Sequence, residues 1–189
     1  TGRGGTTAFS TATEDVTFGV SDVNDAPVLD NTGNVVLPTI SEDNLDPNGN
    51  LVSTLAGSLI SDVDTGAVSG IALTNFQYDA LGRLQRSSDN GGTWQDVPAV
   101  SDGSAMLFDS ADRLRVLPDG ENGGTGSMTF TAWDQTSGTA GTLVDATGRG
   151  GTTAFSTATE DVTFGVSDEN DAPVLDNTGN VVLPTISED

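Results

Sequence analysis

Two short acidic runs, each closed by a proline, are the stretches of this chain best suited to binding chemistry. Ser21–Pro27 reads Ser-Asp-Val-Asn-Asp-Ala-Pro, and Ser167–Pro173 reads Ser-Asp-Glu-Asn-Asp-Ala-Pro. Carboxylate and amide oxygens packed this densely suit a hard cation such as calcium, which takes about six to eight oxygen ligands. Each run follows an alternating apolar segment that predicts a β-strand, and a strand that ends in polar residues and proline is typical of a domain exit. We interpret both runs as inter-domain linkers stiffened by calcium.

Other carboxylates also lie where predicted strands end. Glu42 and Asp43 close the first strand region, and Asp134 ends a later strand. Asp62 and Asp64 stand two residues apart in a turn, so their side chains can point the same way. A single acidic cluster is usually a solvated turn, but alternate strand ends of a β-sandwich gather at one pole, where a linker and a pole together could supply the oxygens of a calcium site. The candidate metal ligands are Asp22, Asn24, Asp25, Glu42, Asp43, Asp62, Asp64, Asp134, Asp168, Asn170, Asp171 and Glu188.

The chain also contains a long internal repeat. Residues 147–189 repeat residues 1–43 at an offset of 146 residues, and the two copies differ only where Val23 becomes Glu169. Because this period exceeds that of solenoid repeats, we expect each repeat to be a whole domain of a tandem array. The predicted division is a C-terminal strand of a preceding repeat (1–21), a calcium-binding linker (22–28), a complete domain (29–167), a second linker (168–174) and the first strand of a following repeat (175–189). An alternative frame takes residues 44–146 as a body completed by strands from 1–43 or 147–189.

Composition excludes several functions. There are 28 acidic residues against 6 basic ones, for a net charge of −22, so the chain has no basic patch with which to bind nucleic acid or anionic lipid. Histidine is absent, which removes imidazole from any catalytic or zinc scheme, and cysteine is absent, so no disulfide stabilises the fold. We find neither a signal peptide nor an apolar run long enough to span a bilayer, so we expect no membrane insertion.

Short alternating segments and many Gly, Asp and Asn turns predict an all-β protein, an antiparallel β-sandwich with about eight strands and no convincing helix. Residues 51–60 are apolar and fit either a strand or a short helical turn. A hairpin is expected from 78–86 and 93–97 around Asp-Asn-Gly-Gly. In the strand over 114–117, Arg113 and Arg115 are expected to point outward.

Ser87–Trp94 matches the Ser-x-Asp-x-Gly-x-Thr-Trp "Asp box" that sialidases and other propellers carry. We interpret it as a turn-folding motif, with Asp89 bonded to turn amides and Trp94 packed beneath. Paired carboxylates could in principle hydrolyse glycosides, but every acidic pair here has a turn or calcium explanation. We therefore expect no catalytic residues and no enzyme.

The acidic motifs together resemble the cadherin family. Asp22–Pro27 resembles the cadherin linker signature Asp-x-Asn-Asp-Asn-Ala-Pro with one Asn missing. Glu42, in Ile-Ser-Glu-Asp, is similar to the glutamate that closes the first cadherin strand, and Asp62–Gly66 resembles the Asp-x-Asp-x-Gly motif. Ala132–Asp134 resembles the Ala-x-Asp of the penultimate strand, and Ser156–Thr159 opens a last strand that runs into the next linker.

The amino-acid sequences of several segments narrow this resemblance. Asp89–Trp94, Ala132–Thr136 and Asn170–Pro173 look like the cadherin-like extender repeats of giant bacterial RTX adhesins. The resemblance implies a Greek-key, cadherin- or immunoglobulin-like sandwich with ligands divided between two poles. At one pole, calcium would be shared by Asp22, Asn24, Asp25, Asp62, Asp64 and Asp134. At the other, Glu42 would face Asp168, Asn170 and Asp171.

Two departures from the cadherin pattern imply fewer ions at each junction than a cadherin holds. The chain has no Asp-Arg-Glu motif, and its linkers lack the second Asn. Because the printed sequence ends at Asp189, we also expect the second linker to lack the acidic residues of a following domain.

The resemblance implies a structural role as a calcium-stiffened extender module. Its repeats would project a distal ligand-binding domain of a bacterial surface adhesin for adhesion and biofilm formation. The expected partners are calcium and neighbouring repeats of the same chain, in a monomeric protein that is exported by type I secretion and lies outside the cell.

Two other functions remain open from the sequence. The first is a calcium-dependent module that binds carbohydrate or protein, with Tyr78, Trp94 or Trp133 stacked on a sugar. The second is homophilic adhesion between arrays, as in animal cadherins.

Overall fold

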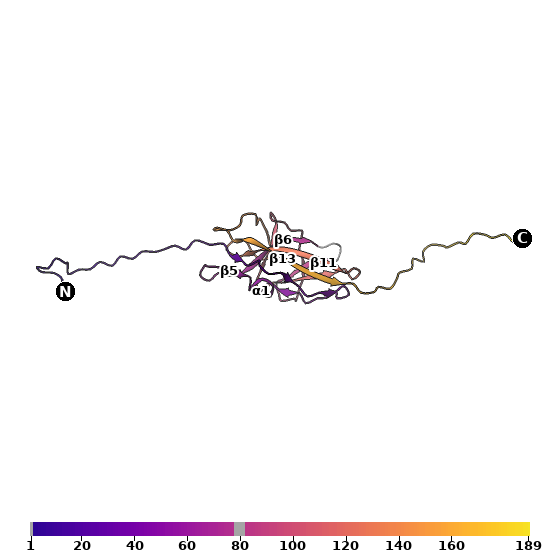
Figure 1. The fold of residues 1–189 in the computed structure, drawn as a ribbon, viewed down its shortest axis with the longest axis horizontal. Coiled ribbons are helices and arrows are strands. Elements are labelled where there is room, and N and C mark those ends of the chain that lie inside the picture. Colours follow the sequence, from indigo (N-terminus) through magenta and orange to yellow (C-terminus); the bar gives the residue numbers. More distant parts are fainter. Residues whose placement is uncertain (1, 78–81) are drawn as a thin grey trace.

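The computed structural model describes residues 2–77 and 82–189, and in it an extended tail leads away from each end of a β-rich body (Figure 1). The predicted hairpin strand over 78–86 lies partly outside the described residues. Residues 10–27 and 168–189 carry no strand, and the tails leave the body at opposite ends. Within the described residues, no helix has the length and apolar character needed to cross a membrane.

Thirteen strands and one short helix occur in the described residues. In chain order they are β1 (Val28–Leu29), β2 (Val35–Val36), β3 (Ile40–Ser41), β4 (Asn50–Leu51), α1 (Val52–Ala56), β5 (Ile60–Ser61), β6 (Gly70–Gln77), β7 (Gly82–Ser87), β8 (Gln95–Asp96), β9 (Ala105–Asp109), β10 (Arg113–Pro118), β11 (Gly124–Trp133), β12 (Leu143–Val144) and β13 (Phe155–Ser167). The all-β class is therefore confirmed, with α1 as its one departure.

The strands form a large sheet in the order β12-β9-β6-β11-β13-β2, a smaller sheet in the order β4-β10-β7-β8, and a ribbon of β1 with β5. Strand β3 also pairs with β13. All pairings are antiparallel except those of β2 and β3, which lie parallel to β13 at one edge of the large sheet. Several antiparallel sheets are consistent with a β-sandwich.

The core follows from the period-two alternation of the strands. In β13, Val162, Phe164 and Val166 are buried while Asp161 and Thr163 are exposed. The inward residues of β6, β11 and β13 pack in one cluster with those of β7 and β10, which joins the two larger sheets. Burying each large apolar side chain contributes about 1.5–3 kcal/mol, so this cluster holds the body together.

The apolar stretch over 51–60 contains both structures that its pattern allowed. It begins in β4, turns through the five-residue helix α1 and ends in β5. Val52, Leu55 and Ala56 are buried, so the short helix is stabilised by packing against the core.

The Asp-box segment folds as a turn, as predicted. One oxygen of Asp89 accepts hydrogen bonds from the Thr93 amide (2.8 Å) and the Ser87 hydroxyl (2.7 Å), and the other accepts the Thr93 hydroxyl (2.8 Å). The Thr93 amide and the two hydroxyls stabilise the carboxylate and lower the pKa of Asp89 to about 2. This geometry gives the motif the turn-stabilising role that its sequence predicts.

The outward orientation expected for Arg115 is wrong. Only 7% of Arg115 is exposed, because β10 lies between β4 and β7 and the loop at Asp46–Pro47 covers it. Its guanidinium donates to Gln85 Oε1 (2.9 Å) and to Asp46 Oδ1 (2.6 Å) and lies 4.1 Å from the centre of the Trp94 ring. Arg115 therefore joins the Asp-box turn to the preceding loop.

Candidate metal centre

Five of the predicted ligands line one open cavity at the end of the body where the N-terminal tail enters, here called the N-terminal pole. The cavity has a volume of about 300 Å³, and the amide side chain of Gln135 is part of its lining. The predicted ligands in the lining are Asp22, Asn24, Asp62, Asp64 and Asp134. They come from the linker, from the turn after β5 and from the residue after β11. The strand ends bring these segments together because β5 and β11 both end at this pole.

The first linker is seated on this pole by direct hydrogen bonds. Asn24 Nδ2 donates to Asp134 Oδ2 (3.0 Å), the Asp25 amide donates to Asp64 Oδ2 (2.9 Å), and the Ala26 amide donates to the Gly151 carbonyl (2.8 Å). Asp25 therefore reaches the pole through its backbone, and its side chain is exposed. Residues 24–26 are therefore attached to the body that follows them in the chain.

Asp62 has one oxygen that these contacts do not satisfy. Its Oδ1 accepts the Asp64 amide (2.9 Å), whereas its Oδ2 is buried and has no hydrogen-bond partner. A buried carboxylate oxygen without a partner is costly, and a cation in the cavity would satisfy it.

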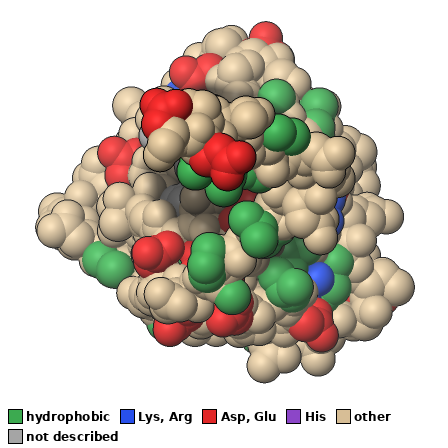
Figure 2. All heavy atoms as spheres, turned by 90° about the vertical axis from the view of Figure 1, so that its right-hand side faces the viewer, with side chains coloured by type: hydrophobic (Ala, Val, Ile, Leu, Met, Phe, Trp, Pro, Cys, Tyr) green, Lys and Arg blue, Asp and Glu red, His purple; other side chains and the backbone are tan. Residues whose placement is uncertain are grey.

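A second set of predicted ligands lies at the opposite end of the body, here called the C-terminal pole. Glu42 follows β3 and is fully buried. Its Oε1 accepts the Glu169 amide (2.6 Å), and its Oε2 is buried without a partner. Asp168 Oδ1 accepts the Gly123 amide (3.3 Å), so the second linker begins on this pole. Figure 2 shows this face, with Asp and Glu side chains at many places on it and few basic ones.

The electrostatics of the C-terminal pole disfavour an ionised Glu42. The Glu169 amide favours the carboxylate, but burial and the nearby charges of Asp168, Asp171 and Asp43 together outweigh it and raise the pKa of Glu42 above its usual value. The stability gained from protonating Glu42 is present below its unfolded-state pKa of about 4.5 and is lost as the pH rises through the higher folded-state pKa. Among the described residues, the Glu169 amide is thus the one contact that offsets the charge of an ionised Glu42, and burial and the acidic neighbours oppose that charge.

Asp62 Oδ2 and Glu42 Oε2 are the two buried side-chain oxygens or nitrogens that lack a hydrogen-bond partner among residues 2–77 and 82–189. Both are carboxylate oxygens, both belong to residues that the sequence analysis predicted as metal ligands, and they lie at different poles. Most buried polar atoms in proteins are satisfied. The donor chemistry at both poles fits a hard, oxygen-binding cation.

Neither pole holds a complete ligand set. In the described parts of the chain, no three acidic side chains converge closely enough to hold a metal ion. The carboxylates at each pole repel one another because they carry like charges. In addition, the side-chain amide of Asn24 binds an oxygen of Asp134, and the backbone amide of Asp25 binds an oxygen of Asp64. A half-turn of the Asn24 carboxamide exchanges its nitrogen for its oxygen, which would turn this donor into a ligand.

The remaining predicted ligands lie further out. Asp43 is exposed beside Glu42, and Asp171 is near enough to raise the Glu42 pKa. Asn170 is exposed and donates to the Asp171 carbonyl (3.3 Å). Glu188 lies in the exposed C-terminal tail, and the structure brings it to neither pole.

Two positioning contacts were missed by sequence reasoning. Thr136 donates its amide (2.8 Å) and hydroxyl (2.6 Å) to Asp134 Oδ1, and the Glu169 amide binds Glu42. The first had a readable signal, since Asp-x-Thr turns with the same two hydrogen bonds recur at Asp30, Asp145 and Asp176. The second had none, because it joins residues 127 positions apart.

The aromatic residues give little support to a sugar-binding face. Trp133 is 1% exposed, and its Nε1 donates to the Ser137 carbonyl (2.7 Å), so it is a core residue. Arg115 lies over the ring of the half-buried Trp94. Tyr78 lies outside the described residues.

The function of this chain must be inferred from its two poles. Comparison with protein-family models, with curated proteins and with solved structures finds no match.

Proposed function

We propose that this chain is a calcium-stiffened spacer module, a Greek-key, cadherin-like repeat of an extracellular bacterial adhesin of the RTX type. Neighbouring repeats meet at the acidic linkers, and the array projects a distal binding domain for adhesion and biofilm formation. The module is monomeric and non-enzymatic, and its resident ion is calcium.

The single observation that carries this proposal is the pair of unsatisfied buried oxygens, Asp62 Oδ2 and Glu42 Oε2, one beside each linker. Asp22, Asn24, Asp64 and Asp134 surround the first. Asp168 and Asp171 lie near the second. When bound, calcium would neutralise these groups and tie each linker to the body that it adjoins.

The repeat gives this site its mechanical role. The two linkers share one sequence apart from Val23 and Glu169, so each linker carries the groups that belong to both poles. In a tandem array, one linker is held by Glu42 of the module before it and by Asp62, Asp64 and Asp134 of the module after it. Strand β13 runs between the poles over about 40 Å and leads directly into the second linker.

The physical effect of the cation follows from charge and linkage. Without it, a linker rich in carboxylates repels itself and stays flexible. Binding to the folded form stabilises it by RT ln(1 + [L]/Kd), which is about 2.7 kcal/mol at a hundredfold excess over Kd. Extracellular calcium modules have Kd values of roughly 10⁻⁴–10⁻³ M, so millimolar calcium outside a cell fills such sites and cytosolic calcium does not. The array would be slack during secretion and stiff outside.

Thermal unfolding and small-angle scattering of the same sample, with calcium and then with chelator, test this function. Calcium at a hundredfold excess over Kd is expected to raise the melting temperature by roughly 5–10 °C. It is also expected to narrow the distribution of linker conformations seen by scattering. An unchanged melting temperature together with an unchanged scattering curve at millimolar calcium contradicts the proposal.

The variant that tests the N-terminal pole is Asp62→Asn, which keeps the size of the side chain and removes its charge. This variant should lose most of the rise in melting temperature that calcium binding at the N-terminal pole produces, while keeping the fold in chelator. The matched control is Asp189→Asn, in the exposed tail, which should keep the whole rise in melting temperature.

A further inference from the structure

One sequence of sixteen residues occurs twice in this chain in two different environments. Residues 28–43 form β1, β2 and β3 on the body, whereas residues 174–189, which are identical to them, are exposed along their whole length. Leu29 is 4% exposed and its copy Leu175 is 85% exposed. The tail therefore carries the side chains that fit the place held by 28–43, here called the β1–β3 site.

The β1–β3 site is built entirely from other parts of the chain. Val28 pairs with Ser61, Val35 lies parallel to Val162, and Ile40 lies parallel to Val166. In addition, Asn31 Nδ2 donates to the Thr159 carbonyl (3.1 Å), and the Asp30 amide donates to the Leu59 carbonyl (2.8 Å). Because every one of these partners lies outside residues 28–43, the tail can form the same contacts.

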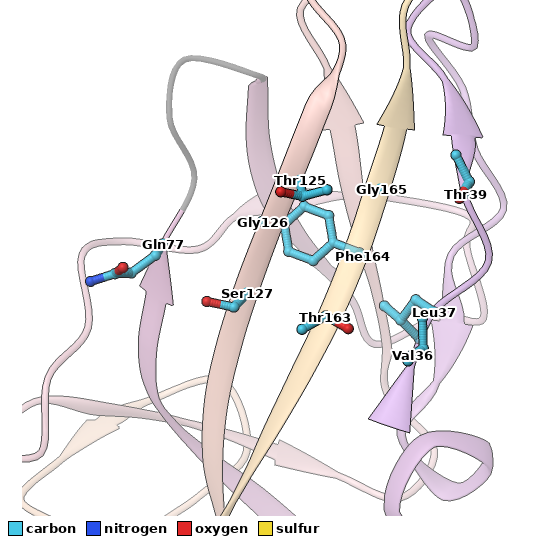
Figure 3. A pocket seen from close by; sticks show the side chains of 10 residues that line it. All are labelled: Val36, Leu37, Thr39, Gln77, Thr125, Gly126, Ser127, Thr163, Phe164 and Gly165. Carbon is cyan, nitrogen blue, oxygen red and sulfur yellow. The ribbon is translucent and has the colours of Figure 1, made fainter. Parts of the chain in front are cut away.

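The resident segment is held in short pieces. Strands β1, β2 and β3 each contain two residues. A cavity of about 560 Å³ lies beside the segment, over the face of β6, β11 and β13 (Figure 3). Its lining residues are Val36, Leu37 and Thr39 of the segment, Thr163, Phe164 and Gly165 of β13, Thr125, Gly126 and Ser127 of β11, and Gln77 of β6. An edge that is paired at so few positions can be exchanged without breaking a long ladder.

The length of chain between β13 and the tail decides which molecule can donate the tail to a given β1–β3 site. Ala26, just before the segment, binds Gly151 beyond the start of β13. Its copy Ala172 follows Ser167, the last residue of β13, by five residues, which span at most about 18 Å. The strand itself is about 40 Å long, so the tail of the same molecule cannot return to the start of the site.

We propose that residues 174–189 of one molecule dock in the β1–β3 site of a second copy of this chain, replacing its residues 28–43. This exchange conserves every contact, so concentration governs it. The resident segment competes with an effective concentration in the millimolar range, so exchange is small at micromolar concentrations of this chain and large at millimolar concentrations. It needs no calcium and therefore stands apart from the proposed function.

Disulfide trapping in the full chain tests the exchange, because the chain has no cysteine of its own. Thr163 lies opposite Val36 in the parallel pair, so its partner in an exchanged molecule is Val182. Oxidised Thr163→Cys/Val182→Cys protein is expected to give disulfide-linked dimers and longer chains that increase with concentration, in chelator as in calcium. Adding Leu29→Ala, which weakens the resident segment, should raise the linked fraction at micromolar protein about tenfold or more.

The matched control places the same change in the tail. Leu175→Ala should lower the linked fraction, since it weakens the incoming segment instead of the resident one. Monomers alone at millimolar protein, whether internally bonded or with free thiols, overturn the exchange. Equal linking in the Leu29→Ala and Leu175→Ala proteins also overturns it. The double-cysteine protein without either change keeps the test valid if Leu29→Ala fails to fold.

Discussion

Replacing Phe164 by alanine is expected to lower the free energy of unfolding by about 3–5 kcal/mol, the usual cost of removing a buried phenylalanine ring. Phe164 is 4% exposed and stacks on Phe76, with ring centroids 5.9 Å apart. Its ring also lies against the backbone of Gly126, where a Cβ would approach it to 2.2 Å. Unfolding in guanidinium chloride, followed by tryptophan fluorescence, gives the free energy.

The chain supplies its own control for this prediction. Phe18 occupies the same place in the first copy of the repeat and is 88% exposed. Phe18→Ala should therefore change the free energy of unfolding by no more than about 0.5 kcal/mol. A large loss at Phe18 with a small loss at Phe164 would show that residues 9–21, in place of 155–167, supply the strand that pairs with β11.

The second large effect is expected at Glu42. Glu42→Gln should weaken calcium binding at the C-terminal pole by about 10–100-fold, since it removes the buried charge that faces the cation. Without calcium at neutral pH, the same variant should be at least as stable as the parent protein, because burial and the acidic neighbours already disfavour the charged form of Glu42. Calcium titrations by calorimetry, with melting curves in chelator, measure both effects.

Glu188→Gln is the matched control, because Glu188 is the exposed copy of Glu42. It should alter neither calcium binding nor stability. The pKa of Glu42 adds a dependence on pH: calcium binding at this pole should fall as the pH drops through that raised pKa, since the proton and the cation compete for one oxygen. If Glu42→Gln and Glu188→Gln behave alike in calcium, Glu42 is not a ligand.

The two copies of the repeat show how much local structure the sequence alone can specify. The Gly4 amide binds the Phe9 carbonyl at 2.8 Å, and the Gly150 amide binds the Phe155 carbonyl at the same distance. These turns form in both environments because their partners are within five residues of each other. The Asp-x-Thr turn at Asp176 likewise forms in the exposed tail, as it does in the body.

The strands of the repeat behave differently. Residues 155–167 form β13, the longest strand among the described residues, whereas the same sequence at 9–21 forms none. The difference lies in the partner: β13 pairs with β11 through hydrogen bonds, and residues 9–21 have no such neighbour. Alternation predicts which residues can form a strand, but tertiary pairing decides which of them do.

The N-terminal pole was predictable because strand ends gather there. Asp62, Asp64 and Asp134 were named from their places after apolar runs, and they do line one cavity. The burial of Glu42 was not predictable, since it depends on contact with residues more than 120 positions away. The burial of Arg115 was not predictable either, because the loop at Asp46–Pro47 that buries it has no regular sequence pattern.

Crystals grown in millimolar calcium, with the ions located by anomalous scattering, test the central claim most directly. The account predicts a calcium ion about 2.3–2.6 Å from Asp62 Oδ2, with oxygens of the first linker among its other ligands. It predicts a second ion on Glu42 Oε2. A structure at saturating calcium in which both oxygens remain without a cation would contradict it.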